Sequence, residues 1–129
     1  MKKVITICLL VISLLAWCSS VNAQSIKYKG TIGPYEVKVS LNYIDNGGGI
    51  NTFGADYEGS YTYIKAGNTL KLQGHSHRMT GSDFEEYTPK GVNSASWHLD
   101  GIIGEKVLKG TFYNKLNGKK FKINLKRTN

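Results

Sequence analysis

The amino-acid sequence predicts an all-β fold, an eight-stranded antiparallel up-and-down β-barrel in which each strand pairs with the next. Three observations lead to this prediction. Apolar and polar residues alternate with a period of two, and no segment fits the helical period of 3.6 better. The connections are short and leave no room for a crossover helix. Glycines recur within the apolar rows, which favours a sheet bent enough to close. A two-sheet β-sandwich is the alternative.

The alternation is clearest from Tyr35 to Tyr43, where five apolar or aromatic residues share one face and four polar residues share the other. This pattern is typical of a strand with one buried face. Comparable runs predict strands at residues 25–32, 35–43, 56–65, 69–77, 82–88, 95–102, 106–113 and 119–126. The expected inward row consists of Tyr28, Tyr35, Val37, Val39, Leu41, Tyr43, Tyr57, Tyr61, Tyr63, Leu70, Leu72, Trp97, Leu99, Leu108, Phe112, Phe121, Ile123 and Leu125.

Turn residues separate these runs. Gly67-Asn68 and Asn117-Gly118 suit tight hairpins, because such turns require a positive φ. The longest connection, residues 45–54, is predicted to be a loop at one barrel mouth, with Phe53 as its apolar anchor.

Glycine inside a strand normally weakens it, so its recurrence needs a physical reason. A strand that lacks a Cβ on its concave side can bend sharply, and a bent sheet can close and hide its edges. The glycines expected to serve this purpose are Gly30, Gly59, Gly74, Gly101 and Gly110.

Residues 1–23 have the layout of a secretory signal peptide. Lys2 and Lys3 precede an uncharged run at residues 4–17, which is shorter than the roughly 20 residues of a membrane span. We expect cleavage after Ala23, which leaves a single exported domain at 24–129, periplasmic or secreted, without a transmembrane span. The alternative is a lipoprotein acylated at Cys18. Both cysteines lie in this leader, so the mature domain would have no disulfide.

Three motifs carry a family resemblance. They are Gly59-Ser60-Tyr61-Thr62-Tyr63, Leu70-Lys71-Leu72-Gln73-Gly74 and Leu108-Lys109-Gly110-Thr111-Phe112. With these motifs the chain resembles small secreted lipocalin-like (calycin-type) β-barrels of bacteria, over most of the mature sequence. The resemblance implies the closed barrel more than it implies a particular function.

The aromatic part of the inward row gives the first functional hypothesis. An eight-stranded barrel is just wide enough to be filled by its own side chains or to hold one small ligand. Tyr35, Tyr61, Tyr63 and Trp97 would line such a pocket, because aromatic faces stack and phenol groups form hydrogen bonds. We therefore expect a non-enzymatic module that binds a small apolar or aromatic ligand. A packed aromatic core explains the same residues without a ligand.

The charge distribution gives the alternative function. The full chain has 17 basic and 9 acidic residues, and its last 24 residues, from Lys106 onward, contain eight basic residues and no acid. Four basic residues of the final hairpin, Lys119, Lys120, Lys122 and Lys126, could bind anionic lipid or polysaccharide of the cell envelope. A solvated strand face explains them equally. No nucleic-acid partner is expected, because no platform of exposed aromatic residues accompanies the lysines.

Residue types also point to two kinds of chemistry that we do not expect. His75, His77 and His98 are candidate zinc ligands by type, but they alternate with apolar residues and fit a solvated outer face. Ser96, His98 and Asp100 have the residue types of a catalytic triad. Residues two apart in a strand are about 6.6 Å apart, however, whereas proton transfer needs about 2.6–3.2 Å. No metal, cofactor or enzymatic activity is predicted.

Overall fold

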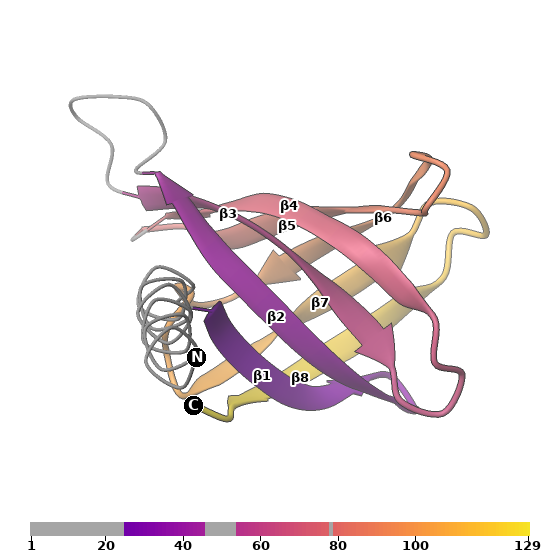
Figure 1. Ribbon diagram of the computed structural model, residues 1–129, viewed down its shortest axis with the longest axis horizontal. Coiled ribbons are helices and arrows are strands. Elements are labelled where there is room, and N and C mark those ends of the chain that lie inside the picture. The colour runs from indigo at the N-terminus through magenta and orange to yellow at the C-terminus, as the bar shows by residue number, and fades with distance from the viewer. Residues whose placement is uncertain (1–24, 46–53, 78) are drawn as a thin grey trace, which may run out of the picture.

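The computed structural model describes residues 25–45, 54–77 and 79–129, and these form an eight-stranded antiparallel barrel (Figure 1). Its strands are β1 (Ser25–Ile32), β2 (Tyr35–Asp45), β3 (Gly54–Tyr63), β4 (Thr69–His77), β5 (Gly81–Tyr87), β6 (Asn93–Leu99), β7 (Val107–Asn114) and β8 (Lys120–Arg127). Each strand pairs with the next, and β1 also pairs with β8, so the sheet is closed. The predicted barrel is confirmed, and the sandwich alternative is wrong.

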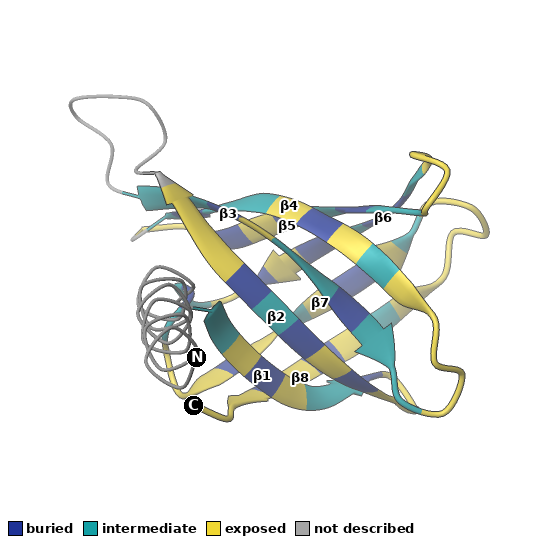
Figure 2. Ribbon diagram, in the orientation of Figure 1, coloured by how far each residue is buried: buried dark blue, intermediate teal, exposed yellow. Residues whose placement is uncertain are grey.

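The alternation seen in the sequence corresponds to the two faces of the wall (Figure 2). In β2, Val37, Val39 and Leu41 are buried, while Lys38 between them is exposed. The strand bounds at 25–32 and 69–77 match the prediction, and the strand expected at 95–102 instead ends at Leu99.

Glycines allow neighbouring strands to approach each other closely. A Cβ placed on Gly59 would lie 1.9 Å from the carbonyl oxygen of Ser40 in the adjacent strand β2. Gly30 and Gly110 each meet a carbonyl oxygen of a neighbouring strand at the same distance. No side chain fits at these positions, so close approach of the neighbouring strand explains these in-strand glycines, a reason that differs from the strand bending expected from the sequence. Gly101 is an exception, because it lies beyond the end of β6.

The described core contains most of the expected inward row, with two errors. Tyr35 is 52% exposed and Tyr43 is 57% exposed. Both lie near the ends of β2, where the wall extends beyond the packed interior, so an inward position there does not bury the side chain. The core comprises Tyr28, Ile32, Val37, Val39, Leu41, Tyr57, Tyr61, Leu72, Phe84, Ala95, Trp97, Leu99, Ile103, Leu108, Phe112, Ile123 and Leu125.

One end of the barrel, here called the capped end, is covered by the connection at residues 100–106. Ile103 of this connection is buried, and its backbone N–H donates a hydrogen bond of 2.9 Å to Ser76 Oγ. The hydroxyl of buried Tyr28 donates to the carbonyl of Glu105 at 2.7 Å and accepts from the N–H of Gly104 at 2.8 Å. The connection is therefore held from both sides. The opposite end carries the β1–β2, β3–β4, β5–β6 and β7–β8 turns, and we call it the aromatic end.

Some expectations lie outside the described residues. These are the signal peptide at 1–23 with its two cysteines, and the loop at 46–53 with Phe53. Within the described part of the chain, no helix is long and apolar enough to cross a membrane.

Candidate functional site

Six aromatic rings form a closed circuit at the aromatic end. Each ring contacts the next, with centroid distances from 4.8 Å to 6.2 Å, and five of the six contacts are edge-to-face. Edge-to-face contacts are favourable because the positive edge of one ring meets the negative face of another. In order around the circuit, the rings are Tyr35, Tyr63, Tyr61, Trp97, Phe112 and Phe121.

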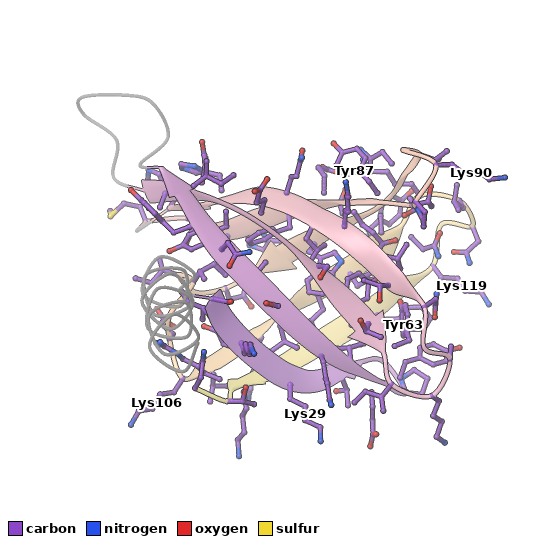
Figure 3. The ribbon with its side chains drawn as sticks, in the orientation of Figure 1. Lys29, Tyr63, Tyr87, Lys90, Lys106 and Lys119 are labelled. Atoms are coloured by element: carbon purple, nitrogen blue, oxygen red, sulfur yellow. The ribbon has the colours of Figure 1, made fainter. Side chains whose placement is uncertain are left out.

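The four residues predicted as a ligand pocket all belong to this circuit. Tyr35 is half exposed at the rim, and Tyr63 is half buried beneath it. Tyr61 and Trp97 are almost completely buried, and their ring centroids are 4.8 Å apart. The circuit thus runs from solvent at Tyr35 into the interior at Trp97. Figure 3 shows Tyr63 at the same end of the barrel as Lys90 and Lys119 of neighbouring turns.

A buried carboxylate that the sequence analysis missed lies beside these rings. Glu86 of β5 is 4% exposed. Its carboxylate accepts hydrogen bonds from the phenol of Tyr61 and from Ser94 Oγ. The phenol oxygens of Tyr61 and Tyr63 are 3.2 Å apart, so Tyr63 joins this network. Burial of a carboxylate is tolerated when donors satisfy its oxygens, as they do here.

The network keeps its phenol groups protonated. Burial raises the pKa of Tyr61 above its ordinary value, and its hydrogen bond to Glu86 raises that pKa further. Burial also raises the pKa of Tyr63. The indole Nε1 of Trp97 is buried and has no acceptor among the described residues. The aromatic end therefore combines ring faces with neutral donors and one buried acceptor group.

The histidines lie on the outer wall, and two of them contact carboxylates. His75 Nδ1 is 2.7 Å from Asp56, and His98 Nδ1 is 2.7 Å from Asp83. The rings of His75 and His77 are 6.2 Å apart. In the residues that the structure describes, no three His, Cys, Asp or Glu side chains converge as metal ligands would. The three candidate zinc ligands are thus not brought together with further ligands.

The Ser96–His98–Asp100 combination is only partly brought together, because His98 Nε2 lies 3.5 Å from Asp100 Oδ1 whereas Ser96 has a different partner. Ser96 Oγ donates to the Glu85 carboxylate at 3.2 Å, and Lys115 Nζ donates to the same carboxylate at 2.8 Å. Partial burial acts to raise the pKa of Glu85, but hydrogen bonds from Lys115 and its neighbours outweigh this and lower it. Ser96 therefore serves as a donor to Glu85.

The lysines of the final hairpin are exposed. Lys119 lies in the β7–β8 turn, and Lys120, Lys122 and Lys126 lie along the outward row of β8. Lys120 Nζ is 5.9 Å from the ring centroid of Tyr113. Because the barrel closes, β8 pairs with β1 as well as with β7. The basic surface therefore extends beyond the hairpin that the sequence indicated.

Comparison of the chain with protein-family models, with curated proteins and with solved structures gives no match.

Proposed function

We propose that the protein is an exported, non-enzymatic binding module of the small secreted lipocalin-like type, which holds a small apolar or aromatic ligand at the aromatic end. The observation that carries this proposal is the closed circuit of six rings leading from half-exposed Tyr35 to buried Trp97. The covering of the opposite end by residues 100–106 favours the aromatic end as the entrance. Eight-stranded barrels of this width can hold one small ligand.

The chemistry beside the rings favours a particular kind of ligand. A flat apolar group can stack on the face of Tyr35 or of Tyr63, whose rings lie edge-to-face with their centroids 5.9 Å apart. A hydrogen-bond donor on the same molecule would match the Glu86 carboxylate below them. An anionic group would be repelled by this carboxylate, because charges interact strongly where water is excluded. We therefore expect a neutral or cationic aromatic molecule with an N–H or O–H group.

Entry of a ligand requires one ring of the circuit to move. Tyr35 is the most exposed of the six, and it closes the circuit between Tyr63 and Phe121. Exposed side chains change rotamer within picoseconds to nanoseconds. A rotation of Tyr35 away from its neighbours would uncover the faces of Tyr63 and Phe121, and the Tyr35 ring would then pack against the bound ligand.

Binding can be measured with N-phenyl-1-naphthylamine, a neutral aromatic amine that fluoresces in apolar surroundings. We expect saturable binding, and Tyr35→Ala should weaken it roughly two- to twelvefold, because one aromatic contact contributes about 0.5–1.5 kcal/mol. Tyr113→Ala removes another exposed tyrosine, which lies on the outer wall of β7, and should leave binding unchanged. Absence of saturable binding, or equal binding by Tyr35→Ala, would contradict the proposal.

Export is a separate part of the proposal. Cleavage after Ala23 would give a protein beginning at Gln24, periplasmic or secreted. Mass spectrometry of the protein recovered from an expressing bacterium tests this. A lipid-modified N-terminus at Cys18 would instead establish the lipoprotein alternative, and an intact N-terminus would refute both.

A further inference from the structure

Closure of the barrel brings lysines from both ends of the chain into one row. Lys126 of β8 lies directly opposite Lys29 of β1, and Lys29 lies directly opposite Lys38 of β2. Neighbouring strands are about 4.8 Å apart, so three ammonium-bearing side chains stand side by side across three strands. Figure 3 shows Lys29 projecting outward from the wall. We call Lys126, Lys29 and Lys38 the lysine row.

The lysine row lowers the stability of the folded protein when no anion is bound. Like charges directly opposite each other on antiparallel strands destabilise the pairing. All three lysines are exposed, and none of them forms an ion pair with a residue whose side chain the structure describes. Glu36 also faces outward on β2, but it lies opposite Thr31 and not opposite a lysine. The repulsion within the row would be relieved by a bound anion.

A hollow in the outer wall adjoins the lysine row. It lies over β1, β2 and β3, and it combines ammonium groups with hydroxyl groups. Both kinds of group donate hydrogen bonds to phosphate, sulfate or carboxylate oxygens. The residues that supply these groups include Lys27, Lys29, Lys38, Ser40, Ser60 and Thr62.

The charges of the molecule are also segregated around the barrel. Strands β7, β8 and β1 carry no acidic residue, and β2 carries exposed Glu36, whereas β3 carries Asp56 and Glu58 and β5 carries Asp83 and Glu85. A protein with such an arrangement presents one basic side to an approaching polyanion, and complementary charge steers the encounter.

We propose that the lysine row and its adjoining hollow bind an anionic polysaccharide, a polymer whose sugars carry sulfate, phosphate or carboxylate groups. The row crosses three strands and can contact successive charges of one polymer chain. Between the lysines, the outward rows carry Thr31, Ser40 and Asn124, which can hydrogen-bond to sugar hydroxyls. Membrane binding depends on burial of apolar side chains as well as on charge, and these polar positions favour the polysaccharide.

The test compares two triple variants of equal net charge. Lys29→Gln/Lys38→Gln/Lys126→Gln removes the row. Lys65→Gln/Lys71→Gln/Lys90→Gln removes three other exposed lysines, which lie on β4 and in turns at the aromatic end. The probe is fluorescein-labelled dextran sulfate, with uncharged dextran as the control polymer and vesicles of phosphatidylcholine and phosphatidylglycerol as the membrane arm.

We expect the native protein to bind dextran sulfate but not dextran, and the affinity to fall steeply between salt concentrations of about 0.02 M and 0.15 M. The row variant should bind at least about tenfold more weakly at the lower salt concentration, and the control variant less than about threefold more weakly. The row variant should also melt at a higher temperature than the native protein, since repulsion is relieved. This separates lost binding from misfolding.

Three results would overturn the proposal. Equal losses in both triple variants would mean that only net charge matters. Binding to the vesicles without binding to dextran sulfate would assign the row to a membrane. A row variant that binds dextran sulfate as tightly as the native protein would remove the row from any role in polyanion binding.

Discussion

Replacement of Gly59 by alanine tests whether the close approach of β2 and β3 excludes a side chain at this position. Glycine inside a strand usually costs about 0.5–1 kcal/mol relative to alanine, so the substitution would ordinarily stabilise the protein. Here the new Cβ would lie 1.9 Å from the carbonyl oxygen of Ser40, in the backbone of β2. An ordinary contact of this kind is at least 3.4 Å. The strands must therefore separate by roughly 1.5 Å at this point.

Such a separation weakens backbone hydrogen bonds between β2 and β3, which contribute about 0.5–1.5 kcal/mol each. Overpacking adds about 1–3 kcal/mol. After subtraction of the usual gain from alanine, Gly59→Ala should lower the free energy of unfolding by about 2–4 kcal/mol. For a domain of this size, that corresponds to a fall in melting temperature on the order of 10–20 °C.

Thermal and urea unfolding followed by circular dichroism measure this effect. Gly101→Ala is the matched control, because its new Cβ would meet side-chain atoms of Glu105 and Leu108, which can move. The control should lose less than about 1 kcal/mol. If Gly59→Ala were as stable as the native protein, the explanation of the in-strand glycines by strand approach would be refuted.

Three further predictions concern the ionisable groups. Tyr61→Phe removes a hydrogen bond to buried Glu86 and should lower the free energy of unfolding in urea by about 1.5–3 kcal/mol; unchanged stability would show that this carboxylate does not need the donor. The pKa of Glu85 is lowered in the folded protein, so the native protein should be more stable than Glu85→Gln at neutral pH, and the difference should vanish as the pH falls below the ordinary value of 4.5. Because the Glu85 side chain is 43% exposed, we expect a difference below about 1 kcal/mol, and one that persists at low pH would contradict its assignment to the Lys115 contact. Burial raises the pKa of Tyr61, so the unfolded state ionises first and stability should fall as the pH rises above 10.0; complete tyrosine ionisation in near-ultraviolet absorbance, with the circular dichroism of the fold unchanged, would contradict this.

The sequence predicted the strands well because one face of each is buried, and burial imposes a period of two. The errors occur at positions where burial of one strand face no longer imposes this period. Tyr35 and Tyr43 keep the inward period but lie near strand ends, outside the packed interior. Ile103 belongs to a connection, where no period exists, and only the folded chain brings it over the capped end.

The functional residues show a similar division. The aromatic residues of the circuit were found because large apolar side chains stand out in an inward row. Glu86 was missed because two of the three inward residues of β5, Ser82 and Glu86, are polar. The inward face of this strand therefore does not differ from the outward face in the sequence as an apolar row would. The available signal was Phe84, the large apolar residue that marks the inward face of β5, since Glu86 lies two residues further along on the same face.

Only one of the three residues of the lysine row was predicted, because the row depends on closure of the barrel. Lys126 belongs to the basic C-terminal segment, which is visible in the composition. Lys29 and Lys38 come from strands near the start of the domain. Only the β1–β8 register places all three together. A property of a closed sheet cannot be read from local alternation.

Both proposals depend on the pairing of β1 with β8, because the lysine row crosses it and the Tyr35–Phe121 contact spans it. The most direct test is a double substitution at two outward positions that lie directly opposite each other, Thr31→Cys/Asn124→Cys. Opposed residues on antiparallel strands have Cα atoms about 4.5–5.5 Å apart, within the range of a disulfide. Under mild oxidation, peptide mapping should find positions 31 and 124 linked. The control Thr31→Cys/Thr111→Cys joins strands about two spacings apart and should stay unlinked. Failure of the first pair to link, or equal linking of both, would contradict the closed barrel.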